Sequence, residues 1–221
     1  MRKVLFTLFV ASNLAVSLTA QSAKPLYENN FEKAAAGTVP EEFLVYEGAF
    51  AVREEGGNKF LELPGAPLET FAVLFGPTER DGLAVSARIF GTAKGRRMPT
   101  FAVGLNNLGG YRLQVSASKK AIELFRGDDV KATAPYEWQS GKWTRLVLQV
   151  RKLKEGEWRA EGKVWTDGGP EPADWTITFT DKPTEKPQEP VPGRATIWGS
   201  PYSGTPIRFD DLAVLPARPK P

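Results

Sequence analysis

Apolar and polar positions alternate with a period of two along most of the chain after residue 25. In residues 83–90, for example, Leu83, Val85, Ala87 and Ile89 occupy every second position. This period is typical of β-strands with one face in a hydrophobic core. About fourteen such segments are expected: 26–31, 43–46, 49–53, 60–63, 71–75, 83–90, 101–106, 111–116, 122–124, 145–150, 158–165, 175–179, 195–198 and 207–215.

Turn residues separate these segments at the spacing of antiparallel hairpins. Asn107-Leu108-Gly109-Gly110 and Glu155-Gly156 each join two long predicted strands. No convincing amphipathic helix follows residue 25. One apolar face per strand suits two antiparallel sheets that pack face to face. The prediction is an all-β fold, a two-sheet antiparallel jelly-roll sandwich.

One domain is expected over residues 26–216. The Pro-rich stretch 181–192 is interpreted as a long surface loop, because a strand pattern resumes after it and the remainder is too short for a second core. Residues 21–25 are expected to be a linker and 217–221 a disordered tail.

The first twenty residues have the pattern of a secretory signal peptide. A positive start, Arg2-Lys3, is followed by an interrupted apolar run and by small residues at Thr19 and Ala20. Cleavage is expected after Ala20, with cleavage after Ser22 as the alternative. The run is too short and too interrupted for a membrane span. Export to the periplasm or the extracellular space is therefore predicted.

Composition excludes several kinds of chemistry. The 221 residues include neither Cys nor His. Disulfides, thiolate nucleophiles, a Ser-His-Asp triad and Cys- or His-ligated metals are thus ruled out. Loss of Arg2 and Lys3 would lower the basic residues from 29 to 27 against 26 acidic residues, a net charge of about +1. That balance gives no electrostatic reason to expect a nucleic-acid partner.

Several local motifs resemble those of the concanavalin A-like lectin/glucanase jelly rolls, in their laminin-G-like branch. They are Asn30-Phe31-Glu32 with Gly37 and Pro40, the stretches 141–146 (GKWTRL) and 162–165 (GKVW), the stretch 172–177 (PADWTI), and 209–214 (FDDLAV). The resemblance extends to secreted bacterial relatives of 3-keto-disaccharide hydrolases and family 16 glycosidases. It implies the sandwich fold and a link to carbohydrates, although fold analogy alone is weak evidence for function.

The chain departs from the enzymes of that group. Family 16 glycosidases carry a Glu-x-Asp-x-Glu cluster on one strand, which places the carboxylates on one face. No such cluster occurs here. Glu155 with Glu157 flanks a turn, Asp210 and Asp211 are consecutive, and Glu123 stands apart. Catalysis by carboxylates distant in sequence stays open.

Polar residues on the outward positions form the predicted ligand face. If strands 83–90, 101–106 and 111–116 are neighbours in one sheet, their outward side chains converge on a patch that suits sugar hydroxyls. An ordinary solvated strand face is the competing interpretation. Aromatic residues at outward or loop positions complete the candidate set. It comprises Arg88, Phe90, Asn106, Arg112, Gln114, Trp165, Trp198 and Tyr202.

A metal site is weakly indicated near the chain ends. If the first and last strands pair, Asn30 and Glu32 would approach Asp210 and Asp211, and such oxygen ligands suit Ca²⁺. A bulge or turn with local hydrogen bonds at Asp210-Asp211 is the favoured interpretation. No cofactor is expected, with a structural Ca²⁺ as the one candidate.

Three functions are consistent with these patterns. The first is an exported, monomeric, non-catalytic module that binds a carbohydrate. The alternatives are a carboxylate-dependent glycoside hydrolase of the 3-keto-disaccharide type and a structural domain that binds an envelope protein. A glycan or an envelope protein is thus the expected partner.

Overall fold

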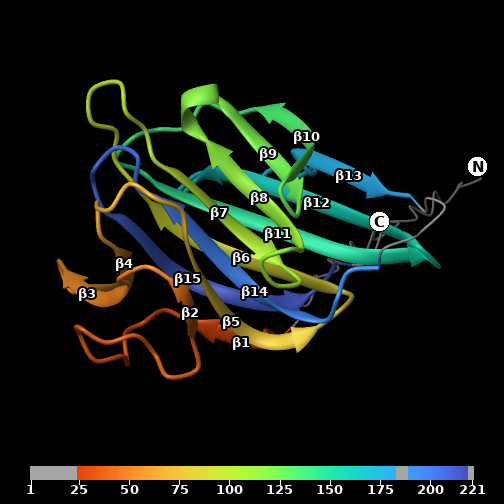
Figure 1. Ribbon diagram of the computed structural model, residues 1–221, viewed down its shortest axis with the longest axis horizontal. Coiled ribbons are helices and arrows are strands. Elements are labelled where there is room, and N and C mark those ends of the chain that lie inside the picture. The colour runs from red at the N-terminus through yellow and green to blue at the C-terminus, as the bar shows by residue number, and fades with distance from the viewer. Residues whose placement is uncertain (1–23, 183–188, 219–221) are drawn as a thin grey trace, which may run out of the picture.

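The computed structural model describes residues 24–182 and 189–218, which form fifteen β-strands and one 3₁₀ turn (Figure 1). The predicted signal peptide lies outside these residues. The elements are β1 (Tyr27–Asn29), β2 (Leu44–Glu47), β3 (Ala51–Glu55), β4 (Asn58–Leu63), β5 (Phe71–Glu79), β6 (Leu83–Phe90), β7 (Thr100–Leu105), β8 (Tyr111–Ser116), η1 (Ala117–Lys119), β9 (Ala121–Arg126), β10 (Asp129–Pro135), β11 (Trp143–Lys154), β12 (Glu157–Thr166), β13 (Ile177–Asp181), β14 (Gly193–Ser200) and β15 (Ile207–Pro216). The predicted two-sheet antiparallel jelly-roll sandwich is confirmed.

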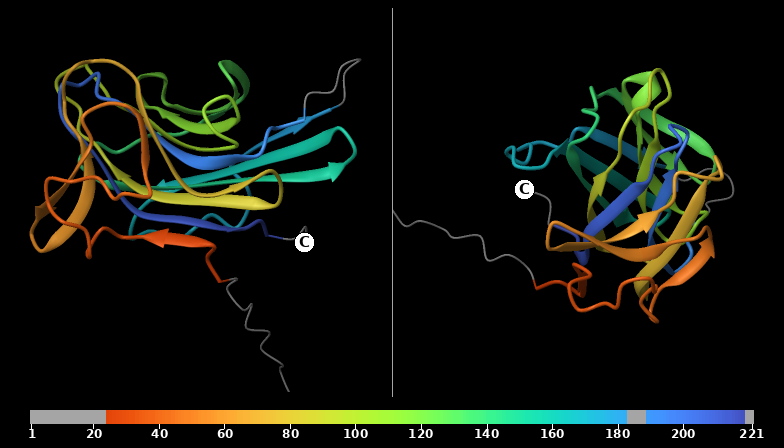
Figure 2. Two further views of the ribbon diagram at one scale, coloured as in Figure 1. Left: turned by 60° about the horizontal axis from the view of Figure 1, so that its bottom comes forward. Right: turned by 90° about the vertical axis from the view of Figure 1, so that its left-hand side faces the viewer.

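The strands form two antiparallel sheets. The eight-stranded sheet has the order β13-β12-β11-β6-β15-β4-β3, and β1 also pairs with β15. The seven-stranded sheet has the order β10-β9-β8-β7-β14-β5-β2. The right-hand view of Figure 2 looks along the strands and shows the two layers nearly end-on. Each sheet has one face toward the other sheet and one toward solvent.

The hydrophobic core lies between the sheets. Val85 and Ala87 of the eight-stranded sheet and Leu113 and Val115 of the seven-stranded sheet are all buried, as the alternation predicts. On β12, Gly162 faces Leu113 of the other sheet. A Cβ at Gly162 would lie 2.8 Å from Leu113 Cδ1, so the glycine makes room for that leucine.

One strand escaped prediction. Strand β10 lies at the edge of its sheet, where β9 is its one partner among the described strands, and most of its side chains are exposed. Only small residues, Ala132 and Ala134, pack from it onto the core. With so little apolar surface it shows no clear hydrophobic alternation.

Segments near the Pro-rich stretch and the C-terminus contact the sandwich. Glu189 forms ion pairs with Arg80 and Lys152, while residues 183–188 lie outside the described part. The Ala217 amide donates to the Gly82 carbonyl at 2.6 Å, and Arg218 pairs with Glu171. The rest of the expected tail is not described. Among the described residues, no helix has the length and apolar character needed to cross a membrane.

Candidate functional site

A hollow of about 150 Å³ lies on the outer face of the seven-stranded sheet. Strand β8 contributes Arg112 and Gln114, and β14 contributes Trp198. Strand β7 runs between them and presents small outward residues, Ala102 and Gly104, so the larger side chains lie across it. The lining residues are Thr70, Thr100, Phe101, Arg112, Gln114, Trp198, Ser200 and Tyr202. Four of them are members of the predicted ligand set.

Arg112 lies between two aromatic rings. Its guanidinium carbon is 4.4 Å from the centre of the Phe125 ring, on β9, and 4.7 Å from the Trp198 ring. Both distances are within the range of cation–π attraction. Burial lowers the pKa of Arg112 from its ordinary value, because the charged form loses contact with water. The group remains charged at neutral pH, since an arginine is effectively always protonated in a protein.

A hydrogen bond to a residue of its own strand, β14, fixes the Trp198 indole. Its Nε1 donates a hydrogen bond of 2.9 Å to Thr196 Oγ1, and Thr196 is buried. Gly104, on the neighbouring strand, leaves room for this pair. A Cβ there would lie 2.4 Å from Thr196 Oγ1 and 3.5 Å from Trp198 Nε1.

A chain of hydrogen bonds orients the Gln114 amide. Glu123 is buried, with 4% of its surface exposed. Burial opposes its ionisation, but hydrogen bonds from Lys119 and Ser116 outweigh this effect and hold the pKa of Glu123 below its usual value. The ionised carboxylate only accepts, so the Ser116 hydroxyl donates to it at 2.5 Å.

The direction of this bond decides what Gln114 presents to the hollow. Because the Ser116 hydrogen is used on Glu123, Ser116 accepts from Gln114 Nε2, at 3.0 Å. The carbonyl oxygen of Gln114 makes no hydrogen bond with the described residues. It therefore remains an acceptor for a ligand hydroxyl.

Hydroxyl groups form one end of the hollow. Thr70 Oγ1 lies 2.8 Å from Ser200 Oγ and 3.3 Å from the Tyr202 hydroxyl. Tyr202 is 44% exposed. The site thus combines an aromatic face, an amide acceptor, hydroxyls that donate or accept, and one cation.

Four predicted site residues lie outside the hollow, three of them on the other sheet. The expectation that strand 83–90 neighbours the other two strands is wrong. Strand β6 belongs to the eight-stranded sheet, between β11 and β15. Arg88 and Phe90 therefore face away from the hollow, where both contact Trp143. Trp165, on β12, shares that outer face opposite Arg145.

Asn106 has a structural position. It is 3% exposed, with a positive φ of 65° that asparagine tolerates. Its Nδ2 donates to the backbone carbonyls of Glu79, Arg80 and Val191. The side chain joins three chain segments, so it offers little to a ligand.

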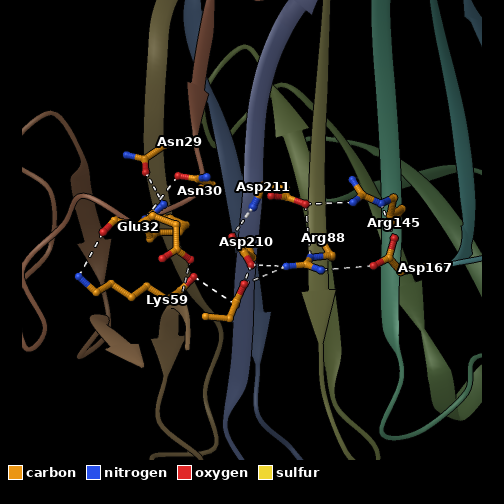
Figure 3. Close-up of polar contacts among 11 residues, drawn as sticks. Asn29, Asn30, Glu32, Lys59, Arg88, Arg145, Asp167, Asp210 and Asp211 are labelled. Carbon is orange, nitrogen blue, oxygen red and sulfur yellow. Dashed lines mark hydrogen bonds and ion pairs between the residues drawn. The ribbon is translucent and has the colours of Figure 1, made fainter. Parts of the chain in front are cut away.

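Two of the acidic residues considered for a metal, Asp210 and Asp211, face arginines (Figure 3). Asp210 accepts from Arg88 Nη2 at 2.5 Å and from Asn58 at 3.0 Å, and Asp211 accepts from Arg145 Nη2 at 3.0 Å. Strands β1 and β15 do pair as expected. Asp211 has φ of 48°, and its amide donates to Asp210 Oδ1 at a register shift in β15, which is the predicted bulge.

Glu32, the third candidate for a metal, has a hydrogen-bond partner on β4. Its Oε1 accepts from the Lys59 amide at 3.0 Å. In the described part of the chain, no group of three or more Asp and Glu side chains is arranged to hold a metal ion. The Ca²⁺ hypothesis for Glu32, Asp210 and Asp211 has no geometric support in these residues.

A wider groove of about 970 Å³ lies on the outer face of the eight-stranded sheet. Its carboxylates belong to Glu28, Glu41, Glu42 and Asp211. Asp211 is paired with arginine, and Glu42 accepts hydrogen bonds from Tyr27 and Asn29. Glu28 and Glu41 are exposed. The groove lacks the aromatic platform found in the hollow.

Comparisons with known proteins show the fold. No family model and no curated protein matches this sequence. Among solved structures, the carbohydrate-binding module CBM66 from Bacillus subtilis is 12% identical, with a TM-score of 0.52 over 79% of this chain and 95% of that chain. A Bacillus subtilis protein of unknown function with a galectin-like fold is 12% identical, with a TM-score of 0.62 over 90% of this chain and 99% of that chain.

The carbohydrate recognition domain of Emp46p, in its metal-free form, is 12% identical, with a TM-score of 0.57 over 90% of this chain and 100% of that chain. These matches agree with a galectin-like, concanavalin A-like sandwich. The narrower resemblance to 3-keto-disaccharide hydrolases stays a prediction.

Sequence reasoning missed several parts of the site. Thr70 precedes β5 and Ser200 ends β14, and neither belongs to a distinctive motif. Phe125 follows the alternation of β9, but nothing in the sequence places it beside Arg112. Gly104 reads as an ordinary strand residue, since its role depends on Thr196 in a strand far along the chain.

Proposed function

We propose that this chain is an exported, non-catalytic β-sandwich module that binds a carbohydrate in the hollow formed by β7, β8 and β14. One observation carries the proposal. The Trp198 ring, the Gln114 carbonyl and the hydroxyls of Thr70, Ser200 and Tyr202 surround a single hollow. Sugars present apolar C–H faces that pack on aromatic rings and hydroxyls that both donate and accept.

The fold supports the same conclusion. CBM66 is named as a carbohydrate-binding module and the Emp46p domain as a carbohydrate recognition domain. At 12% identity these names carry no residue-level information, so the argument rests on the hollow itself.

The absence of a catalytic pair from the hollow favours binding over hydrolysis. Glycoside hydrolysis requires two carboxyl groups on either side of the scissile bond, one with a raised pKa. Among the described residues that line the hollow there is no Asp or Glu. The nearby Glu123 has a lowered pKa and is occupied by Lys119 and Ser116, which suits a structural anion.

A glycan array probed with the full-length protein tests the proposal, followed by calorimetric titration of any glycan that binds. Trp198→Ala should weaken that binding by about 10-fold or more through loss of the stacking surface. Trp165→Ala is the matched control, because Trp165 lies on the opposite outer face. Melting temperatures should be measured for both variants to exclude unfolding.

The outcomes separate the candidate functions. Equal binding by Trp198→Ala and the wild-type protein would overturn the hollow as the site. Release of reducing sugar from a bound glycan would favour the hydrolase. Failure to bind any glycan, together with capture of an envelope protein, would favour the protein-interaction domain.

A further inference from the structure

Arg112 makes no hydrogen bond and no ion pair with any described residue. Its Nε is buried without a partner. Every other partly buried arginine of the described chain has at least one carboxylate or backbone carbonyl partner for its guanidinium group. Arg88 and Arg208 bind carboxylates, and Arg194 donates to the carbonyls of Gly76 and Glu42. A desolvated cation without an acceptor costs free energy, so its persistence in the hollow indicates an acceptor brought by a ligand.

The surroundings of Arg112 leave its charge uncompensated. Asp128 and Glu123 influence it through space, but neither forms an ion pair with it. Asp128 is exposed, so water screens its effect. The Glu123 charge is balanced by Lys119, whose Nζ lies 2.8 Å from Glu123 Oε1. The hollow therefore presents a net positive charge.

The rings on either side of Arg112 restrict how a ligand can approach. The Phe125 and Trp198 rings both pack against the guanidinium, and its N–H groups point outward in its own plane, so a ligand forms hydrogen bonds at the edge of the group. The edge of a guanidinium matches a planar carboxylate, which accepts two parallel N–H bonds. A neutral hydroxyl would leave the charge unpaired.

We propose that the hollow selects a sugar that carries a carboxylate, a uronic acid unit of a polysaccharide, with Arg112 as the carboxylate anchor. This inference rests on the proposed function, since it names the substrate class of the same site. In this arrangement the carboxylate accepts hydrogen bonds from Arg112, and a ring hydroxyl donates to the Gln114 carbonyl. The C–H face of the sugar packs against Trp198. Sugars that lack the carboxylate forgo the charged contact.

The test uses tetrasaccharides of galacturonate, glucuronate and mannuronate, each with its methyl-esterified, uncharged counterpart. Calorimetry with the full-length protein should show at least one acid form binding roughly 10- to 100-fold more tightly than its ester, as expected for a charged hydrogen-bonded contact. The preference should shrink as NaCl is raised from 20 to 500 mM. The ester comparison needs no variant, so it does not depend on a substitution that folds.

Substitutions then locate the effect. Arg112→Gln should abolish the preference for acid over ester, because it weakens binding of the acid form far more than binding of the ester. Arg112→Lys should retain part of the preference, because lysine keeps the positive charge but cannot donate two parallel hydrogen bonds to a carboxylate. Arg53→Gln is the control for a general loss of positive charge, since Arg53 is exposed on β3, in the other sheet.

Each outcome decides a separate point. Equal binding of acids and esters that still depends on Trp198 would overturn the carboxylate anchor and leave the carbohydrate-binding proposal intact. Tighter binding of a sulfated galactose tetrasaccharide than of every uronate would overturn the carboxylate in favour of sulfate. A failure of all acid, ester, sulfated and neutral probes would overturn both proposals together.

Discussion

Replacing Gly104 by alanine tests how the hollow is built. The added Cβ would lie 2.4 Å from Thr196 Oγ1 and 2.9 Å from the Tyr111 carbonyl oxygen, closer than real Cβ contacts. Thr196 is fully buried and accepts the Trp198 indole hydrogen bond, so it has no free space into which to rotate. Overpacking costs about 1–3 kcal/mol, and loss of the indole bond about 0.5–1.5 kcal/mol.

The expected loss is therefore about 1.5–4.5 kcal/mol, a fall in melting temperature of roughly 3–18 °C for a domain of this size. Differential scanning calorimetry measures it. Gly109→Ala is the matched control, because a Cβ at Gly109 meets no atom within 4 Å. In the double variant Gly104→Ala/Thr196→Ala, removal of the clashing oxygen should recover part of the loss.

The reasoning fails if Gly104→Ala melts like Gly109→Ala. It also fails if the double variant shows simply the sum of the two single effects. Either result would mean that the outer face of β7 has room for a side chain at position 104. The arrangement of Arg112 and Trp198 across that strand would then need another explanation.

Three further predictions concern stability and the orientation of Gln114. Burial opposes ionisation of Asp167 and Glu161, but arginine contacts outweigh it and lower both pKa values. Their stabilisation is complete above the unfolded values of 3.8 and 4.5 and is lost as pH falls through the lower folded values, so melting temperature should drop below about pH 4.5. A flat profile down to pH 2.5 would contradict this. Phe209→Ala, in the core, should cost about 3–5 kcal/mol in chemical denaturation. A loss under 1 kcal/mol would refute its packing role. Ser116→Ala should weaken glycan binding about 2- to 10-fold by releasing the Gln114 amide, and unchanged calorimetric affinity would disprove the relay.

The sequence predicts which face of a strand is buried better than it predicts which strands are neighbours. Alternation correctly places Val85 and Leu113 inward, because burial has a local signature with a period of two. It cannot place Arg88 and Arg112 on different sheets, since a jelly roll pairs strands that are distant along the chain. Strand β6 thus neighbours β11 and β15, where simple order suggests β7.

Side-chain partners are predicted least well. Asn106 has a side-chain amide of the kind that binds sugar hydroxyls. Its loop nevertheless turns this amide inward, where it donates to three backbone carbonyls. Arg88 and Arg112 are equivalent as sequence positions. The structure alone shows that one contacts three aspartates while the other has no acceptor among the described residues. Such contacts depend on segments far apart in the chain, which local patterns do not encode.

Strand β15 runs from the region of the hollow to the region where the first and last described segments of the chain lie. The hollow lies near the turn that precedes Ile207, whereas β1 and Ala217 contact the region around Val214 and Gly82, toward the other end of the strand. Ten residues of extended chain span roughly 30 Å. A tether at either end, whether a fused protein or an immobilising tag, should therefore leave the hollow open to large polymers. If the hollow binds a glycan as proposed, several copies tethered on one surface would engage one glycan strand at several points, which multiplies a weak single contact.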